Sequence, residues 1–204
     1  MNSYFTKHSW GNATLVDLMA ELETTSGREL RSWSQAWLET AGVNTLTPSV
    51  EVDDSGMITR LDVIQTAPNE YPTLRPHRMT TGFYDFVDGK LVRVHGVEFD
   101  VDGEHTEVPD TAGRQRPALI LLNDDDLAYA KVRLDDASFD TARKHLRDFE
   151  NSLPRAVVWG AAWNGTRDGQ IPARHFVDLL LDNIGAETDS TTILTQLRNL
   201  ATTL

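Results

Sequence analysis

Hydrophobic residues near the start of the chain recur at the spacing of an α-helix. The positions i, i+3, i+4 and i+7 are occupied by Leu15, Leu18, Met19 and Leu22. Residues at this spacing lie on one stripe of a helix. Thr14 and Asp17 have the side chains that cap a first turn, so the sequence predicts a helix that starts at Thr14.

A second helix is predicted over residues 27–41. Ser26 and Glu29 have the spacing of a capping box, and Gly42 suits the left-handed residue that often ends a helix. The apolar positions between them are Leu30, Trp33, Ala36 and Trp37. The first 47 residues are therefore expected to form a helical pair.

From about residue 48 the hydrophobic period changes from 3.6 to 2, which is typical of strands. The alternating runs contain Val50 and Val52, Leu61 and Val63, and Leu91 to Val94. They are bounded by Asp54-Ser-Gly56, Asp88-Gly89 and Asp102-Gly103. Such turns tolerate positive φ and join antiparallel neighbours, which predicts a meander or a small sandwich.

The apolar positions shift phase at residues 95–96, because Val92 and Val94 are even-numbered whereas Val97 and Phe99 are odd-numbered. One extra residue must be absorbed there, which predicts a β-bulge or a strand corner at His95-Gly96. We expect Gly96 to hold a conformation that other residues resist.

Proline and helical signals organise the rest of the chain. Residues 67–77 carry three prolines and are predicted to form a loop or an edge that crosses between sheets. After Asn123 the helical period returns, with caps at Asp135 or Asp136, at Asp189 or Ser190, and Pro154 and Pro172 in first turns.

The predicted fold class is α+β. An amino-terminal helical pair (1–47) is followed by a small antiparallel β-sandwich (48–122) and an antiparallel α-helical array (123–204). A chain of this length is long enough for more than one hydrophobic core.

The amino-acid composition limits the kinds of partner that the chain is expected to bind. The formal net charge is −12, which disfavours nucleic acid because that binding depends on neutralising phosphates with cations. The chain has no cysteine, which agrees with a reducing compartment and a cytoplasmic location. No apolar run approaches the roughly 20 residues that cross a bilayer, so no membrane association is expected.

No catalytic, cofactor-binding or metal-binding residue is predicted. The six histidines are His8, His77, His95, His105, His145 and His175. No two of them have the spacing that a zinc-binding H-E-x-x-H helix needs. Asp124 to Asp126 lack the alternation of a calcium loop and are expected to form a solvated turn and helix cap, with a weak divalent-cation site as the alternative. The pairs Trp33 and Trp37, and Trp159 and Trp163, are expected to pack helices.

Several segments resemble bacterial, actinobacterial-type aminopeptidase N, a zinc metallopeptidase family. They are Tyr4 to Asp17, Gln65 to Pro68, Pro72 to Arg78, Gly82 to Asp85, Leu121 to Asp135, Ser152 to Arg155 and Trp159 to Trp163. The resemblance implies that residues 1–47 end a thermolysin-like catalytic domain, that 48–122 form the β-sandwich domain, and that 123–204 begin the carboxy-terminal helical domain.

By this resemblance the chain is a carboxy-side fragment without the zinc motif. The parent enzyme would use zinc to remove amino-terminal residues from peptides, while this chain alone is expected to be inactive. Its expected partners are the upstream catalytic domain and, in the whole enzyme, a peptide substrate. Apolar residues on the amino-terminal helices are then left uncovered, which predicts a homodimer, a swap between chains or mobility.

Two other functions remain open. One is a free-standing β-sandwich module with flanking helices, which would bind a peptide or protein along an edge strand near the proline loop. The other is a self-contained hydrolase that uses scattered Asp and His residues, which we rank last.

Overall fold

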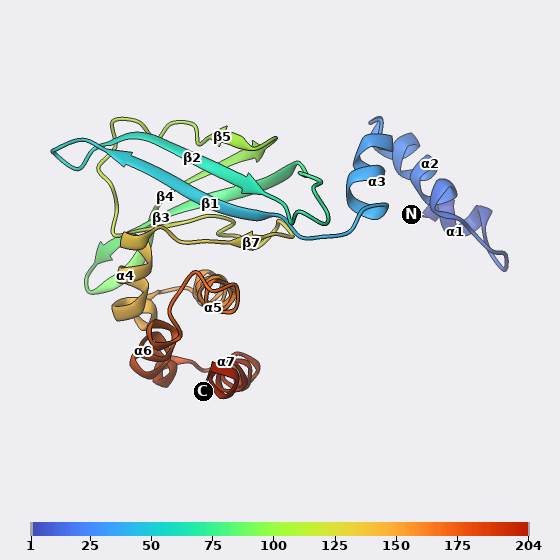
Figure 1. The fold of residues 1–204 in the computed structure, drawn as a ribbon. Helices are drawn as coiled ribbons and strands as arrows, with labels where there is room; N and C mark the ends of the chain where they lie inside the picture. The colour runs from blue at the N-terminus through green and yellow to red at the C-terminus, as the bar shows by residue number, and fades with distance from the viewer. Residues whose placement is uncertain (1, 204) are drawn as a thin grey trace.

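Two β-sheets stacked face to face form the centre of the computed structural model, which describes residues 2–203 (Figure 1). The first sheet has the order β5-β2-β1-β7, with bounds His105–Glu107, Ile58–Thr66, Thr45–Val52 and Lys131–Val132. The second has the order β4-β3-β6, with bounds Lys90–Val101, His77–Val87 and Leu119–Leu121. The chain is α+β, as the sequence predicts.

The turns behave as their residues predict, with one exception. β1 and β2 are antiparallel neighbours, and so are β3 and β4, whose connection holds Asp88 and Gly89 at positive φ. The turn at Asp102-Gly103 instead carries the chain from β4 to β5, which pairs with β2 in the other sheet. The prediction of a hairpin there is wrong. The proline loop after β2 also crosses between the sheets. β7 adds a short parallel pairing to β1 that the sequence did not indicate.

The phase shift in β4 is a real bulge, but its extra residue is Val94. Phe83 of β3 faces His95, while the next residue, Tyr84, faces Arg93. Val94 therefore has no counterpart. The bulge changes which face the odd-numbered residues of β4 occupy, since Leu91 is buried in a different core from Val97.

Gly96 lies outside this bulge, in regular register opposite Gly82. Its φ is not in the left-handed region, and an added Cβ would lie 3.6 Å from the Thr80 methyl, an ordinary contact. The expectation that Gly96 requires the freedom of glycine is wrong.

β6 contributes to two cores. Ile120, together with the following residue Leu122, is buried between the two sheets. Leu119 and Leu121 are buried against the carboxy-terminal helices. Because a strand places successive side chains on opposite faces, a strand covered on both faces has a continuous apolar sequence.

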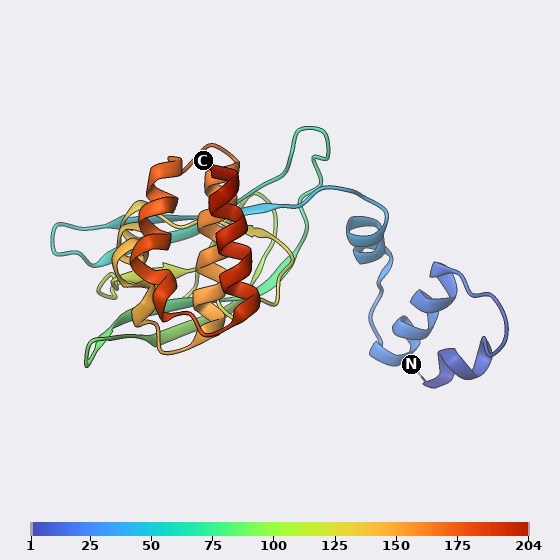
Figure 2. The ribbon, with the colours of Figure 1, turned by 90° about the horizontal axis from the view of Figure 1, so that it is seen from below.

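The helices after β7 cover the outer face of the second sheet (Figures 1 and 2). Their bounds are Asp136–His145 (α4), Ser152–Arg167 (α5), Ala173–Asn183 (α6) and Ser190–Thr203 (α7), with short 3₁₀ turns at 146–148 and 184–186. The cap at Asp135 is confirmed, because its side chain accepts from the Ser138 N–H. The cap at Asp189 is confirmed by a 2.7 Å hydrogen bond from the Thr192 N–H. Pro172 precedes α6 as its cap rather than lying in the first turn.

Three helices occur within residues 2–38, where the sequence predicts a pair, and the helix predicted over 27–41 is shorter in the structure. They are α1 (Asn2–Lys7), α2 (Leu15–Ser26) and α3 (Arg31–Leu38). The start at Thr14 is confirmed by a complete capping box with Asp17. The box expected at Ser26 is wrong, because Gly27 adopts φ +68° and closes α2 through its N–H to the Glu23 carbonyl. α3 therefore begins only at Arg31.

Within residues 2–203, every helix is too short or too polar to span a membrane.

Candidate functional site

A buried arginine joins the amino-terminal helices to the sheets. Arg75 lies in the proline loop, and its guanidinium is directed at the carboxy-terminal end of α3. Nε donates to the Ala36 carbonyl at 2.6 Å, and Nη2 donates to the Ala41 carbonyl at 2.9 Å and to the Thr40 hydroxyl at 2.9 Å. The last carbonyls of a helix have no partner within the helix and carry partial negative charge. Arg75 therefore caps α3 from the sheet side.

Two aromatic side chains complete this joint. The Arg75 guanidinium lies 5.5 Å from the ring centre of Trp37, a cation–π distance. The Trp37 ring meets His77 edge to face at 5.2 Å. Burial, with a smaller effect from the Arg75 charge, lowers the pKa of His77 to about 4. His77 is therefore neutral near pH 7, and its Nε2 lies 3.0 Å from the Gln65 side-chain oxygen.

Beyond this joint, the three amino-terminal helices lie to one side of the sheets (Figure 2). None of α1, α2 and α3 buries an apolar side chain. The buried residue of α2 is Glu21, whose carboxylate pairs with Lys7, and that of α3 is Ser34. Phe5 is 62% exposed and Val16 is 75% exposed. Helices in folded proteins normally bury an apolar stripe, so this surface lacks a cover within residues 2–203.

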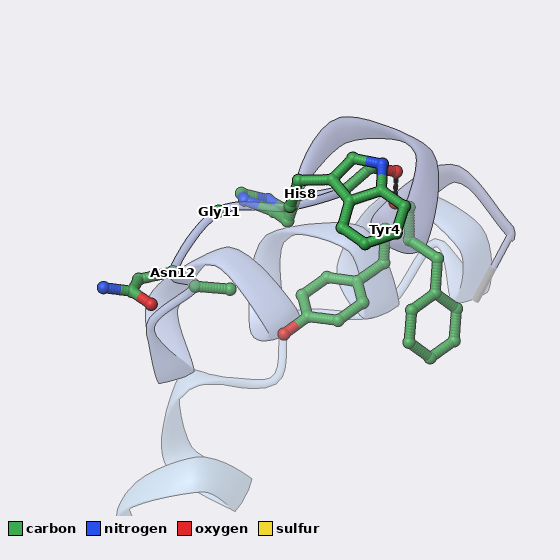
Figure 3. Close-up of a pocket in the computed structure, with 8 residues that line it drawn as sticks. Tyr4, His8, Gly11 and Asn12 are labelled. Carbon is green, nitrogen blue, oxygen red and sulfur yellow. Dashed lines mark hydrogen bonds between the residues drawn. The ribbon is translucent and has the colours of Figure 1, made fainter.

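Two hollows lie on the surface formed by α1, α2, α3 and the connection between α1 and α2, which we call the amino-terminal apolar surface. One is a groove of about 430 Å³ between α2 and α3, lined by Leu15, Val16 and Met19 among others. The other, of about 700 Å³, includes Tyr4, His8, Gly11 and Asn12 (Figure 3). The rings of Tyr4 and His8 are 5.1 Å apart. Both hollows are lined by a mixture of apolar and polar residues, which suits contact with another protein surface.

The three aspartates after β6 lie in a turn, as the sequence predicts, but Asp124 is buried rather than solvated. Asp124 is 1% exposed, and its carboxylate accepts from the Tyr84 hydroxyl at 2.6 Å and from Arg93 at 2.7 Å. Burial raises the pKa of Asp124, opposed by these two hydrogen bonds. Burial and the Asp124 hydrogen bond also raise the pKa of Tyr84. Both carboxylate oxygens of Asp124 are thus paired, and we regard this cluster as a tie between β3, β4 and the segment after β6.

The histidines are dispersed over the fold. The structure places His8 after α1, His77 in β3, His95 in β4, His105 in β5, His145 at the end of α4 and His175 in α6. His145 pairs with Asp148 at 3.0 Å. Among residues 2–203, no three His, Asp or Glu side chains are grouped so that they could hold a metal ion.

The tryptophan pairs differ from each other. Trp159 is buried, and its indole donates to Glu187 at 2.8 Å, while Trp163 lies 5.4 Å from the ring of Phe176. This pair packs helices, as predicted. Trp33 is exposed and Trp37 contacts the sheet joint, so the amino-terminal pair does not lie on one buried face.

Sequence reasoning missed the role of Arg75 and the burial of Asp124. The signal for Arg75 was an arginine between two prolines, in a loop that otherwise reads as solvent-exposed. For Asp124 the signal was weaker, since three adjacent aspartates are usual in exposed turns.

Two comparisons with known proteins give a match to this chain. Residues 119–204 match a family model described as the ERAP1-like C-terminal domain. Over 196 residues, or 93% of this chain, the sequence is 52% identical to a protein of Streptomyces lividans named aminopeptidase N. The chain spans 23% of that relative's length.

Proposed function

Because the chain is related to aminopeptidase N over 93% of its length, we propose that it serves as a non-catalytic, carboxy-side part of such an enzyme. In this proposal, residues 1–47 end the catalytic domain, 48–122 form a β-sandwich spacer, and 123–204 begin a helical domain that caps the peptide cavity. The whole enzyme would remove amino-terminal residues from peptides. The observation that carries the proposal is 52% identity along almost the whole chain.

The amino-terminal apolar surface supports this role. A helix of α2's length contributes to stability mainly through the apolar face that it buries, yet α2 buries only Glu21. An upstream catalytic domain would supply the missing cover. Arg75 would then fix the angle between that domain and the sandwich, since it binds the end of α3 from a loop between the two sheets.

The residues of this chain do not fit a zinc site of their own. A catalytic zinc needs three protein ligands and an open position, and no such group occurs between residues 2 and 203. We therefore assign no catalytic step to this chain. In the proposed enzyme the metal chemistry belongs to residues outside it.

A segment replacement tests the proposal. This chain would replace the matching segment of the Streptomyces lividans aminopeptidase N, and chelator-sensitive hydrolysis of an aminoacyl chromogenic substrate would be measured. We expect the hybrid to retain activity. Val16→Glu in the hybrid should strongly reduce activity or expression, because it puts a charge into the proposed domain contact. Leu127→Glu is the matched control, since Leu127 is 76% exposed and lies far along the chain from α2.

A folded but inactive hybrid would contradict the proposal, and so would a Val16→Glu hybrid as active as its parent. If the isolated chain instead bound peptides by itself along a strand edge, the free-standing module would be the better interpretation.

A further inference from the structure

A pocket of about 320 Å³ lies where the sheets meet the carboxy-terminal helices. Thr47 of β1 lines one side, and the helices α4 and α5 line the other. The apolar part of the lining consists of Leu134, Phe139, Ala161, Ala162 and Ile171. Ligand pockets frequently form at such junctions between structural units and are mostly apolar with a few polar groups. This pocket has no part in the proposed role of the chain as a spacer.

The charged group of the pocket is Arg133, which follows β7. Arg133 is only 7% exposed. Its Nη2 pairs with the carboxylate of Asp168, but Nε and Nη1 have no hydrogen-bond partner among residues 2–203. A guanidinium carries five N–H donors, so most of the donors of Arg133 are unused. Buried polar groups are almost always paired, and each exception calls for an explanation.

Arg133 does not have a carboxylate to itself. Asp168 is shared between Arg133 and Lys131, whose Nζ lies 2.8 Å from it. The unpaired donors of Arg133, rather than the net charge, are what favour an anion, because the carboxylate of Asp136 also lines the pocket. The unpaired nitrogens of Arg133 are covered by neighbouring atoms, so an anion would reach them when the guanidinium turns toward the pocket. Carboxylates match a guanidinium especially well because they accept two parallel hydrogen bonds.

We propose that this pocket binds a small monocarboxylate with an apolar body. The carboxylate pairs with Arg133, and the body packs against Phe139 and Ile171. The volume is at the lower end of the range for ligand pockets, which selects a small metabolite rather than a peptide chain. Gln170, which also lines the pocket, can donate a hydrogen bond to the second carboxylate oxygen.

Asp136 sets the specificity of the pocket. It lines the same pocket and is exposed at the start of α4. A carboxylate there repels a second negative charge on the ligand, which disfavours dicarboxylates and phosphates. A bare anion such as acetate lacks the apolar body and should bind weakly.

The test uses 4-methylpentanoate as the probe and neutral 4-methylpentanamide as its matched control. Binding to the full chain would be measured by calorimetry, and the Nε–H signal of Arg133 would be followed by NMR. We expect saturable binding of the acid, at least about tenfold weaker binding of the amide because a charge-assisted pair is lost, and a shift of the Arg133 signal. Arg133→Gln should abolish binding.

Asp136→Asn keeps the proposal testable if the Arg133 variant does not fold. It removes an exposed charge and should tighten binding of the acid by about two- to fivefold, because a repulsion at the rim disappears. Asp140→Asn, one turn further along α4 and outside the pocket lining, should leave affinity unchanged.

Equal affinity for the acid and the amide would overturn the proposal. An Arg133 signal that does not move on binding, or identical effects of Asp136→Asn and Asp140→Asn, would also overturn it. A folded Arg133→Gln variant with unchanged affinity leads to the same conclusion.

Discussion

At the scale of single residues, Arg75 has the largest expected effect on the joint between helices and sheets. Arg75→Met removes the hydrogen bonds to the carbonyls of Ala36 and Ala41, and the Ala36 carbonyl keeps only the one from the Thr40 hydroxyl. We expect the free energy of unfolding to fall by about 2–4 kcal/mol. Residues 39–44 should also become more sensitive to proteases, because α3 is no longer held. Denaturant unfolding and limited proteolysis measure the two effects.

Arg78→Met is the control for this substitution. Arg78 lies in the adjoining strand and pairs with Glu98 and Asp100 on an exposed surface. Exposed ion pairs contribute little to stability, so this variant should unfold like the parent. Equal losses in the two variants would mean that Arg75 has no special role.

The lowered pKa of His77 predicts that the stability of the chain depends on pH. Its pKa in the folded chain is lowered to about 4, whereas an unfolded histidine titrates near 6.5. Between these values the unfolded chain binds more protons than the folded chain, so stability is lost as the pH falls from about 6.5 to 4. The loss should be on the order of 2–3 kcal/mol.

The comparison with His77→Gln isolates this effect from other titrating groups. Chemical denaturation at about pH 7.5, 6, 5 and 4 would measure the free energy of unfolding of both proteins, because this range includes the folded and the unfolded pKa of His77. The variant should show a shallower loss on acidification. Parallel curves for the two proteins would show that His77 does not titrate as its burial implies.

Gly82 and Gly96 face each other across β3 and β4 and provide a matched pair. A Cβ at Gly82 would lie 2.5 Å from an oxygen of Asp124 and 2.8 Å from the ring of Tyr84. Gly82→Ala should therefore destabilise the chain by about 1–3 kcal/mol through overpacking. Gly96→Ala should have little effect, because its Cβ has only ordinary contacts. Midpoints of thermal unfolding compare the two, and similar midpoints would contradict the assigned packing.

At the scale of secondary-structure elements, the amino-terminal helices predict self-association. An uncovered apolar surface of several hundred Å² usually leads to contact with another molecule. We expect light scattering to show that the isolated chain associates as its concentration rises. Val16→Glu should suppress this association, while Leu127→Glu, a charge at another exposed leucine, should not. A monomer at all concentrations would mean that these helices need no cover.

Elements that depend on local signals could be predicted from the sequence, and those that depend on distant partners could not. Thr14, Asp135 and Asp189 cap helices through residues three positions away, so their spacing is sufficient. Tyr84, whose hydroxyl donates to Asp124, is 40 residues away from it along the chain. Ala36, whose carbonyl accepts from Arg75, is 39 residues away from that arginine. Neither contact has a signature within a short window. The bulge shows an intermediate case, because the phase shift revealed an extra residue but not that the residue was Val94.

At the scale of the whole molecule, the chain on its own should not hydrolyse aminoacyl amides or retain stoichiometric zinc. The physical reason is the lack of a grouped set of ligands within residues 2–203. Chromogenic aminopeptidase assays and metal analysis of the purified chain measure this, with a mock purification as the control for host enzymes. Turnover that a chelator abolishes, and that the mock preparation lacks, would refute it.

The double burial of β6 determines which parts of the molecule can move. The carboxy-terminal helices cannot swing against the sheets without pulling Leu119 and Leu121 out of one core, or Ile120 and Leu122 out of the other. The sheets and the carboxy-terminal helices must therefore move together as one rigid body. Bending is left to residues 39–44, which have no helix or strand structure. Arg75 spans that segment, so a single side chain determines how freely this rigid body can rotate relative to the amino-terminal helices.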